Sequence, residues 1–125
     1  MPRVLVADDE VSMRTLVARA IAMDGHATVT AEDGAEALEI INRENGAFDL
    51  LLTDIKMPVM DGIALALAVA RDFPDLTILL MTGFADQRER AHGLNAIVHD
   101  VVTKPFSVAD IRTAVADALT AKKAG

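Results

Sequence analysis

The sequence of 125 residues contains no cysteine, tryptophan or tyrosine, and only four phenylalanines. Without cysteine, the chain has neither a disulfide framework nor thiolate ligands for a metal. The few aromatic rings offer little surface for stacking on nucleic-acid bases. Acidic residues also outnumber basic ones, 19 to 12, whereas nucleic-acid binding depends on neutralising phosphates with cations. We therefore expect no nucleic acid among the partners of this chain.

The sequence shows no pattern typical of export or membrane insertion. No apolar run approaches the length of about 20 residues that spans a bilayer. The N-terminal stretch MPRVLVADDE places Asp8 and Asp9 where a signal peptide would continue its apolar segment. These features predict a cytoplasmic protein. The length predicts a single domain over residues 1–125, without a separate output domain.

What the sequence does contain is an alternation of short apolar runs and helical patterns. Runs typical of strands cover residues 4–7, 27–31, 48–54, 76–81 and 101–103. The segments between them predict helices over 12–23, 35–44, 63–73 and 85–95, and a last helix after the N-cap Ser107. Five alternating units of this kind predict an α/β fold, with a parallel sheet covered by helices on both faces.

Polar residues stand where four of the predicted strands end. Asp8 and Asp9 follow the first strand, Asp54 the third, Thr82 the fourth and Lys104 the fifth. Ligands of open parallel sheets bind outside the carboxyl ends of the strands. We therefore expect these five residues to converge on one site. Each could be ordinary turn or capping chemistry if taken alone, and only their joint placement favours a functional site.

Three carboxylates in one crevice repel one another, and burial raises their pKa values further. A divalent hard cation removes that penalty. Magnesium prefers carboxylate oxygens, keeps several waters and commonly bridges to a phosphate. The sequence therefore predicts a Mg²⁺ site made by Asp8, Asp9 and Asp54.

The same residues suit phosphoryl transfer. A carboxylate can act as a nucleophile and form an acyl phosphate, and the protein then supplies mainly positioning and charge neutralisation. Asp54 is the predicted nucleophile, with Asp8, Asp9 and the metal holding the phosphoryl oxygens. Lys104 would pair with a further oxygen, and the Thr82 hydroxyl would donate to the attached phosphate.

At these spacings the acidic pair Asp8-Asp9, the run TDIKMPVMDG around Asp54, the MTG of Thr82 and the KPF of Lys104 form a specific set. The sequence resembles a response-regulator receiver domain, similar to the chemotaxis receiver, over essentially all of its length. This resemblance implies a flavodoxin-like fold, with five helices around a five-stranded sheet in the order 2-1-3-4-5. It also implies that a histidine kinase or a histidine phosphotransfer protein phosphorylates Asp54.

The resemblance further implies roles for individual residues. Asp9, Asp54 and the backbone carbonyl of Lys56 would bind magnesium directly, and Asp8 would act mainly through water. Lys56 and Phe84 would flank the phosphate. The turns after the strands would depend on the loop residues Pro58, Gly62, Gly83 and Pro105, with a cis peptide bond between Lys104 and Pro105.

The sequence departs from the receiver pattern at Val101. Receivers commonly carry an aromatic residue at this position, and it rotates inward when the threonine moves to the phosphate. Coupled switching of that kind is therefore not predicted here, although Thr82 itself can still move. The segment NAIVHD also lacks the usual Gly-Ala turn, which predicts an atypical face around the last strand.

These features predict a single-domain response regulator of a two-component phosphorelay. Phosphorylation of Asp54 would switch its binding to a downstream protein, without turnover of an external substrate. One alternative is a CpdR-type adaptor, which resembles this chain in the MTGFA run and delivers substrates to a ClpXP protease when unphosphorylated. A phosphatase with an aspartyl nucleophile would need an acid two residues after Asp54, where Lys56 stands. A flavin carrier would need a phosphate-binding loop where Asp8, Asp9 and Glu10 stand.

Overall fold

The computed structural model describes residues 2–83 and 93–124. It contains a five-stranded parallel sheet in the order β2-β1-β3-β4-β5, which confirms the predicted fold class. The strands are β1 (Arg3–Ala7), β2 (Ala27–Ala31), β3 (Leu50–Asp54), β4 (Thr77–Thr82) and β5 (Asp100–Thr103). The described helices are α1 (Val11–Ala22), α2 (Gly34–Arg43), α3 (Gly62–Asp72) and α5 (Val108–Ala124).

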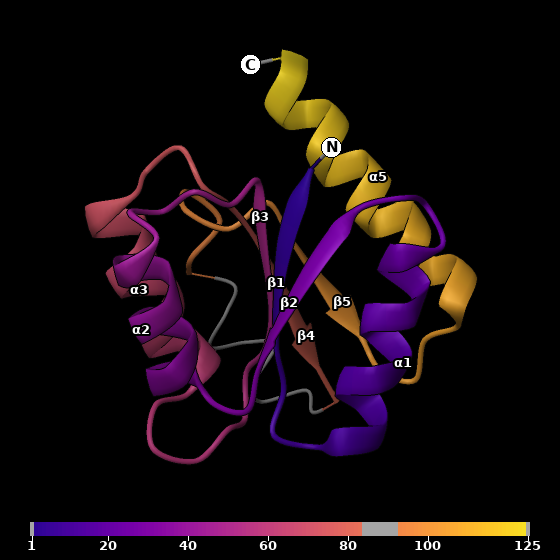
Figure 1. The fold of residues 1–125 in the computed structure, drawn as a ribbon, viewed down its shortest axis with the longest axis horizontal. Helices are drawn as coiled ribbons and strands as arrows, with labels where there is room; N and C mark the ends of the chain where they lie inside the picture. Colours follow the sequence, from indigo (N-terminus) through magenta and orange to yellow (C-terminus); the bar gives the residue numbers. More distant parts are fainter. Residues whose placement is uncertain (1, 84–92, 125) are drawn as a thin grey trace.

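The sheet is buried on both sides, with α2 and α3 over one face and α1 and α5 over the other (Figure 1). Side chains alternate between these faces along each strand. In β1, Leu5 packs in the core under α2 and α3, while Val4 and Val6 pack in the core under α1 and α5. Burial on both faces explains why the strands appear in the sequence as nearly continuous apolar runs.

Side-chain caps fix where three of the helices begin. The Asp33 carboxylate accepts a hydrogen bond from the backbone N–H of Glu36 at the start of α2. Asp61 caps α3 in the same way. At α5, the predicted cap Ser107 accepts from the backbone of Asp110, whose carboxylate accepts from the backbone of Ser107 in return. Such caps satisfy N–H groups that would otherwise lack a partner.

One predicted helix lies only partly within the described residues. Residues 85–92 of the predicted helix 85–95, and Phe84 before it, lie outside the described residues. Residues 93–97 form a turn, closed by hydrogen bonds from the backbone of Ile97 and Val98 to the carbonyl of Leu94. The prediction of helix at residues 93–95 is therefore wrong, because the chain turns there toward the start of β5.

Parallel pairing brings the carboxyl ends of the strands to one edge of the sheet, the lower edge in Figure 1. Ala7 of β1 pairs with Thr53 of β3, and Thr82 of β4 pairs with Thr103 of β5. Residues just beyond β1, β3 and β5 therefore meet around Asp54. In the described parts of the chain, no helix has the length and hydropathy needed to cross a membrane.

Candidate functional site

Asp54 is the last residue of the central strand β3, and its residue surface is only 7% exposed. Its Oδ1 accepts a hydrogen bond from the backbone N–H of Ile55 at 3.0 Å. The same oxygen lies 3.4 Å from Nζ of Lys104. Among the described residues, no hydrogen bond ends on Oδ2. One oxygen of this nearly buried carboxylate is therefore held in place, and the other is left for a ligand or for reaction.

Asp8 follows β1 and is completely buried. Its Oδ1 accepts a hydrogen bond from the backbone N–H of Glu10 at 3.0 Å. Its Oδ2 has no hydrogen-bond partner among the described residues. Nζ of Lys104 lies 3.8 Å from this Oδ2, a distance that allows electrostatic attraction but is too long for a hydrogen bond. A buried acceptor without a partner is costly, which points to a ligand at this oxygen.

Asp8, Asp9 and Asp54 each offer a carboxylate oxygen, and these oxygens lie within 4.8 Å of one another. The predicted cluster therefore forms, with the Asp9 side chain on its exposed side. Lys104 offsets only one of the three negative charges. An all-oxygen set with an acceptor that lacks a partner, open to water at Asp9, fits Mg²⁺, which binds few carboxylates and keeps several waters.

Burial sets the protonation behaviour of the site. Removal from water raises the pKa of Asp54 to about 6, and the neighbouring Asp8 charge adds to the rise, while Lys104 acts in the opposite direction. The pKa of Asp8 is raised as well, mainly by burial. A bound divalent cation would reverse both shifts, because it stabilises the ionised carboxylates.

Thr82 and Lys104 come from neighbouring strand ends. Thr82 closes β4 and is completely buried. The backbone N–H of Lys104 donates to the carbonyl of Thr82 at 2.7 Å, so the two predicted site residues are tied together through the main chain. The peptide bond between Lys104 and Pro105 is cis, which confirms that prediction.

The loop from β3 to α3 folds back on the strand that carries Asp54. The backbone N–H of Gly62 donates to the carbonyl of Ile55 at 2.8 Å. A Cβ at Gly62 would collide with the carbonyl oxygen of Asp54, so this position requires glycine. Lys56 and Pro58 are exposed in the loop. The loop therefore closes beside Asp54.

Two further predicted positions have weaker steric constraints. A Cβ at Gly83 would lie 3.8 Å from the side chain of Lys104, an ordinary van der Waals distance. The conformation observed here therefore does not require glycine at this position. Val101 pairs with Leu80 of β4 and is partly buried against the core under α2 and α3. A small aliphatic side chain thus occupies the position that is commonly aromatic in the family it resembles.

Sequence reasoning missed Arg14 of α1. Its side chain is 14% exposed, and its Nη1 donates to the backbone carbonyl of Asp8 at 2.8 Å. Its Nη2 lies 3.9 Å from Oε1 of Glu32, which follows β2. Arg14 therefore holds the turn that presents Asp8 and Asp9. No pattern in the sequence indicates this contact, because an arginine on an amphipathic helix is usually a solvated residue.

The sequence and the fold match those of one family of known proteins. The family model for the response regulator receiver domain matches residues 4–116. A CheY-like receiver domain protein from Methanospirillum hungatei JF-1 superposes with a TM-score of 0.88 at 26% identity, covering 98% of this chain and 97% of that one. The response regulator TrrA from Thermotoga maritima, solved in complex with Mg(2+)-BeF, gives a TM-score of 0.82 at 30% identity, covering 94% of this chain and 98% of that one.

Curated relatives are longer proteins. The chain is 34% identical over 113 residues to the probable transcriptional regulator ycf27 of Guillardia theta, which covers 90% of this chain and 43% of that regulator. Across the first curated relatives the chain spans slightly less than half of their length. Their similarity therefore concerns the domain described above and not the remainder of those regulators.

Proposed function

The chain belongs to the response regulator receiver domain family of two-component signalling, and from this premise we propose that Asp54 is its phosphoacceptor. The observation that carries the proposal is the carboxylate of Asp54, nearly buried at a strand end, with Oδ1 held by Ile55 and Lys104. One of its carboxylate oxygens lies within 4.8 Å of carboxylate oxygens of Asp8 and Asp9. A carboxylate fixed at one oxygen and free at the other is suited to nucleophilic attack.

The reaction is transfer from a phosphohistidine. The Asp54 Oδ2 bonds to phosphorus while the bond between phosphorus and the donor imidazole nitrogen breaks. The electron pair leaves with that nitrogen, which takes up a proton. Lys104 stays paired with the site oxygens through its ammonium group, and the Thr82 hydroxyl donates to the attached phosphoryl group. Asp9, Asp54 and the carbonyl of Lys56 would hold Mg²⁺ directly, with Asp8 acting through water, and the bound ion would supply neutralising charge for the phosphoryl oxygens.

Thr82 is the residue that would couple phosphorylation of Asp54 to a change in conformation. A buried hydroxyl drawn toward the phosphate moves the end of β4, and β5 follows because Lys104 is bonded to the carbonyl of Thr82. We expect a downstream protein to recognise the surface around β5 and the start of α5 in only one of two states, phosphorylated or unphosphorylated. Val101 replaces the commonly aromatic switch residue, so this motion proceeds without ring rotation.

The site suits a self-modifying switch better than an enzyme with external substrates. Lys56, two residues after Asp54, is exposed and cannot serve as the general acid that an aspartyl phosphatase needs. We expect slow hydrolysis of the chain's own aspartyl phosphate and no turnover of small phosphomonoesters. The stand-alone and protease-adaptor interpretations stay predictions from the sequence.

Labelling with radioactive acetyl phosphate in the presence of Mg²⁺ tests the proposal. The unmodified chain should incorporate close to one phosphoryl group, and Asp54→Asn should incorporate none. Asp33→Asn is the matched control, because Asp33 stands at the same edge of the sheet but caps α2. Asparagine also caps helices well, so this variant should label normally. Equal labelling of Asp54→Asn and the unmodified chain would show that the assignment is wrong.

A further inference from the structure

A groove between α1 and the edge strand β2 carries positive charge, although the whole chain has a net charge of −7. Its volume is about 350 Å³, within the range of small-molecule sites. Two arginines of α1, Arg14 and Arg19, line the groove, and none of the acidic residues that the structure describes does so. The groove therefore attracts anions on a molecule that otherwise repels them.

Three threonines add hydroxyl groups to the same groove, namely Thr15 of α1 and Thr28 and Thr30 of β2. The two strand threonines pair with Val4 and Val6 of β1, whose side chains pack in the core under α1 and α5. Residues that pair in a parallel ladder point to the same face of the sheet, so both threonines face α1. Phosphate oxygens accept hydrogen bonds from hydroxyl and guanidinium groups. The groove thus combines two kinds of donor that suit a phosphoryl group.

Both arginines keep hydrogen-bond donors for a ligand. A guanidinium group has five N–H donors, and Arg14 uses only Nη1 within the described residues, for the carbonyl of Asp8. Glu32 lies 3.9 Å from Nη2 of Arg14, too far for a hydrogen bond, and its side chain is 72% exposed. Arg19, in the last turn of α1, forms no ion pair in the part of the chain that the structure describes. At most one of the two positive charges is therefore offset.

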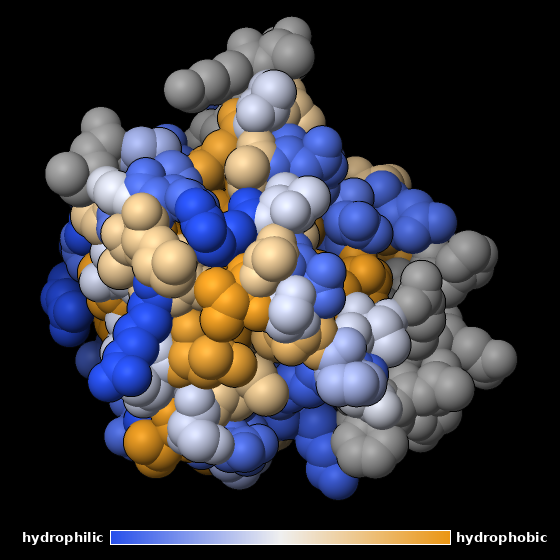
Figure 2. All heavy atoms as spheres, turned by 90° about the vertical axis from the view of Figure 1, so that its right-hand side faces the viewer, coloured by the Kyte–Doolittle hydropathy of each residue, from blue (hydrophilic) through white to orange (hydrophobic). Residues whose placement is uncertain are grey.

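Other surfaces offer less basis for selecting a ligand. A larger cavity of about 530 Å³ lies where the strands begin, and it is lined by Asp24 and Arg112, which neutralise each other at 2.6 Å. The side of the molecule that α1 and α5 form also shows an apolar area at its surface (Figure 2). Neither feature selects a ligand by charge, whereas the groove between α1 and β2 does.

We propose that this groove binds a small phosphomonoester, with the phosphoryl group between the guanidinium groups of Arg14 and Arg19. Its carbon skeleton lies against Ala18 and Ala22, which stand four residues apart on one side of α1 and line the same groove. A phosphomonoester carries about two negative charges at neutral pH, which match the two arginines. Arg14 also holds the turn that presents Asp8, so the ligand contacts a residue that supports the metal site. The inference does not depend on the role proposed for Asp54.

Isothermal titration of the metal-free chain at neutral pH with three probes tests the proposal. The probes are phenyl phosphate, inorganic phosphate and phenol. Without Mg²⁺ the carboxylates around Asp54 repel phosphate, so binding at that site does not contribute to the signal. We expect phenyl phosphate to bind more tightly than inorganic phosphate, because its ring packs on the alanines, and phenol, which lacks the charge, to show no binding.

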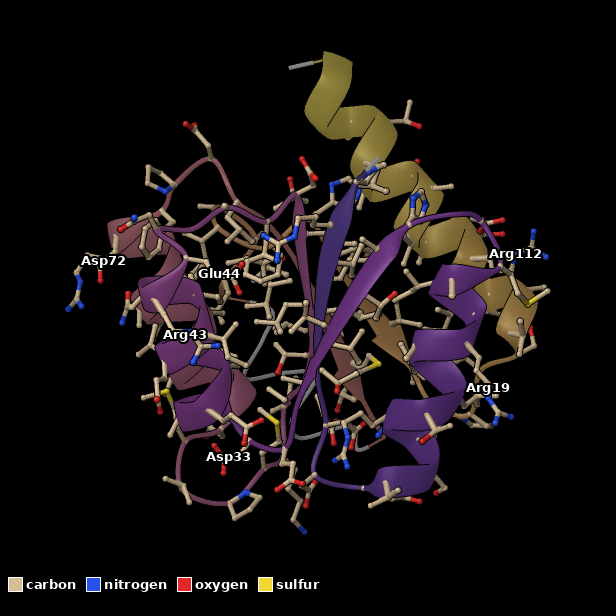
Figure 3. The ribbon with its side chains drawn as sticks, in the orientation of Figure 1. Arg19, Asp33, Arg43, Glu44, Asp72 and Arg112 are labelled. Carbon is tan, nitrogen blue, oxygen red and sulfur yellow. The ribbon has the colours of Figure 1, made fainter. Side chains whose placement is uncertain are left out.

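Four variants test the contacts. Arg19→Gln should weaken phenyl phosphate binding about tenfold, as for the loss of a charge-assisted hydrogen bond, and Thr30→Val about threefold. Glu32→Gln should strengthen binding about threefold, because it removes the carboxylate that competes for Arg14. Arg43→Gln is the matched control and should bind as the unmodified chain does. Like Arg19, Arg43 stands in the last turn of its helix, but Figure 3 shows it on α2, over the opposite face of the sheet.

Three results would overturn the inference. The first is the absence of phenyl phosphate binding to the unmodified chain, or binding of phenol with equal affinity. The second is equal affinity of Arg19→Gln and the unmodified chain, and the third is an equal loss in Arg43→Gln, which would show a general effect of charge. A gain in Glu32→Gln separates binding from folding, because a damaged fold would not bind more tightly. Labelling of Asp54 by acetyl phosphate is measured separately, so the proposed function stands or fails on its own result.

Discussion

The two edges of the sheet use charged residues in opposite ways. At the edge where the strands begin, Arg112 of α5 bonds to Asp24 at 2.6 Å, and Arg3 bonds to Glu44 at 2.7 Å. Figure 3 shows Glu44 at the end of α2 and Arg112 on α5, both far from the edge where Asp33 begins α2. At the edge where the strands end, Asp8 and Asp54 are buried, and Lys104 offsets only part of their charge.

The pKa values of the carboxylates shift in opposite directions at the two edges. The hydrogen bond from Arg112 lowers the pKa of Asp24, so folding favours its charged form. Burial raises the pKa values of Asp54 and Asp8, so folding opposes their charged forms. Charges at the first edge therefore stabilise the fold, whereas those at the second edge destabilise it until a cation binds. Poor stability of a charged cluster is thus a sign of a ligand site.

The largest effect on stability is expected for Gly62→Ala, and it is best compared with an alanine substitution of Gly25 at the other edge. Gly62→Ala places a Cβ against the backbone carbonyl of Asp54, and neither group can yield. We expect this variant to lose about 3 kcal/mol or more in the free energy of unfolding. Gly25 lies at the other edge with φ +81°, but a Cβ there meets nothing within 4 Å. Gly25→Ala should cost only about 1 kcal/mol, from its left-handed backbone. Urea denaturation measures both, and equal losses would show that the contact at Gly62 is relieved by movement of the loop.

The second effect concerns pH in the absence of Mg²⁺. Because the folded pKa of Asp54 is about 6, above its ordinary value of 3.8, the folded state binds the proton more tightly than the unfolded state. Stability should therefore fall as pH rises from about 4 to about 6, and the loss persists above that range. Allowing for solvent screening, we expect about 2 kcal/mol from this group.

Asp54→Asn should remove most of that pH dependence and should make the metal-free protein more stable at pH 7. A smaller slope of the same sign should remain, because the pKa of Asp8 is also raised. Saturating Mg²⁺ should stabilise the unmodified chain above pH 6, since the metal binds only the ionised carboxylates. Denaturation curves at several pH values, with and without Mg²⁺, measure these changes. A metal-free stability that rises with pH in this range would contradict the account of the site.

The sequence predicted much of the fold and of the site because both follow from simple periodic rules. Buried parallel strands produce apolar runs such as LLLTD, and the ends of these strands meet at one edge whatever the details of packing. The positions of Asp8, Asp54, Thr82 and Lys104 at strand ends were therefore sufficient to predict their convergence. The cis bond before Pro105 followed from the family resemblance and not from the residues alone.

Contacts that depend on the path of a loop could not be predicted. Arg14 donates to a backbone carbonyl. Every residue type has such a carbonyl, so no pair of residue types in the sequence indicates the contact. The left-handed conformation of Val59 contradicts the preference of its residue type, so local propensity points away from it. The turn at 93–97 replaced the end of an expected helix, and it contains Gly93 and Asn95, residue types that favour turns over helix interiors.

The third effect tests whether the carboxylate edge depends on Arg14. Arg14→Met keeps the packing of the side-chain stem but removes the donor to the carbonyl of Asp8. We expect the affinity for Mg²⁺ to fall about tenfold, as for loss of a residue that orients metal ligands. Arg14→Lys should recover part of the loss, because an ammonium group can reach the same carbonyl. Isothermal titration with Mg²⁺ measures the affinity, and the thermal unfolding of both variants shows whether stability has changed instead. Unchanged affinity in Arg14→Met would show that the turn holds its shape without this bond.

The smallest effect is expected where charges are paired and exposed. Arg112 holds Asp24 in the charged form, so Asp24→Asn should lower Tm slightly at neutral pH, because surface ion pairs contribute little. The sign of its pH dependence is the sharper test. A lowered folded pKa means that the stabilisation is present above the unfolded pKa and disappears as pH falls through the folded value. Asp24→Asn and the unmodified chain should therefore converge in Tm at low pH, whereas Asp54→Asn and the unmodified chain should diverge as pH rises above 4. If the Tm differences of the two variants from the unmodified chain changed with pH in the same direction, the charges at the two edges would not differ as their contacts indicate.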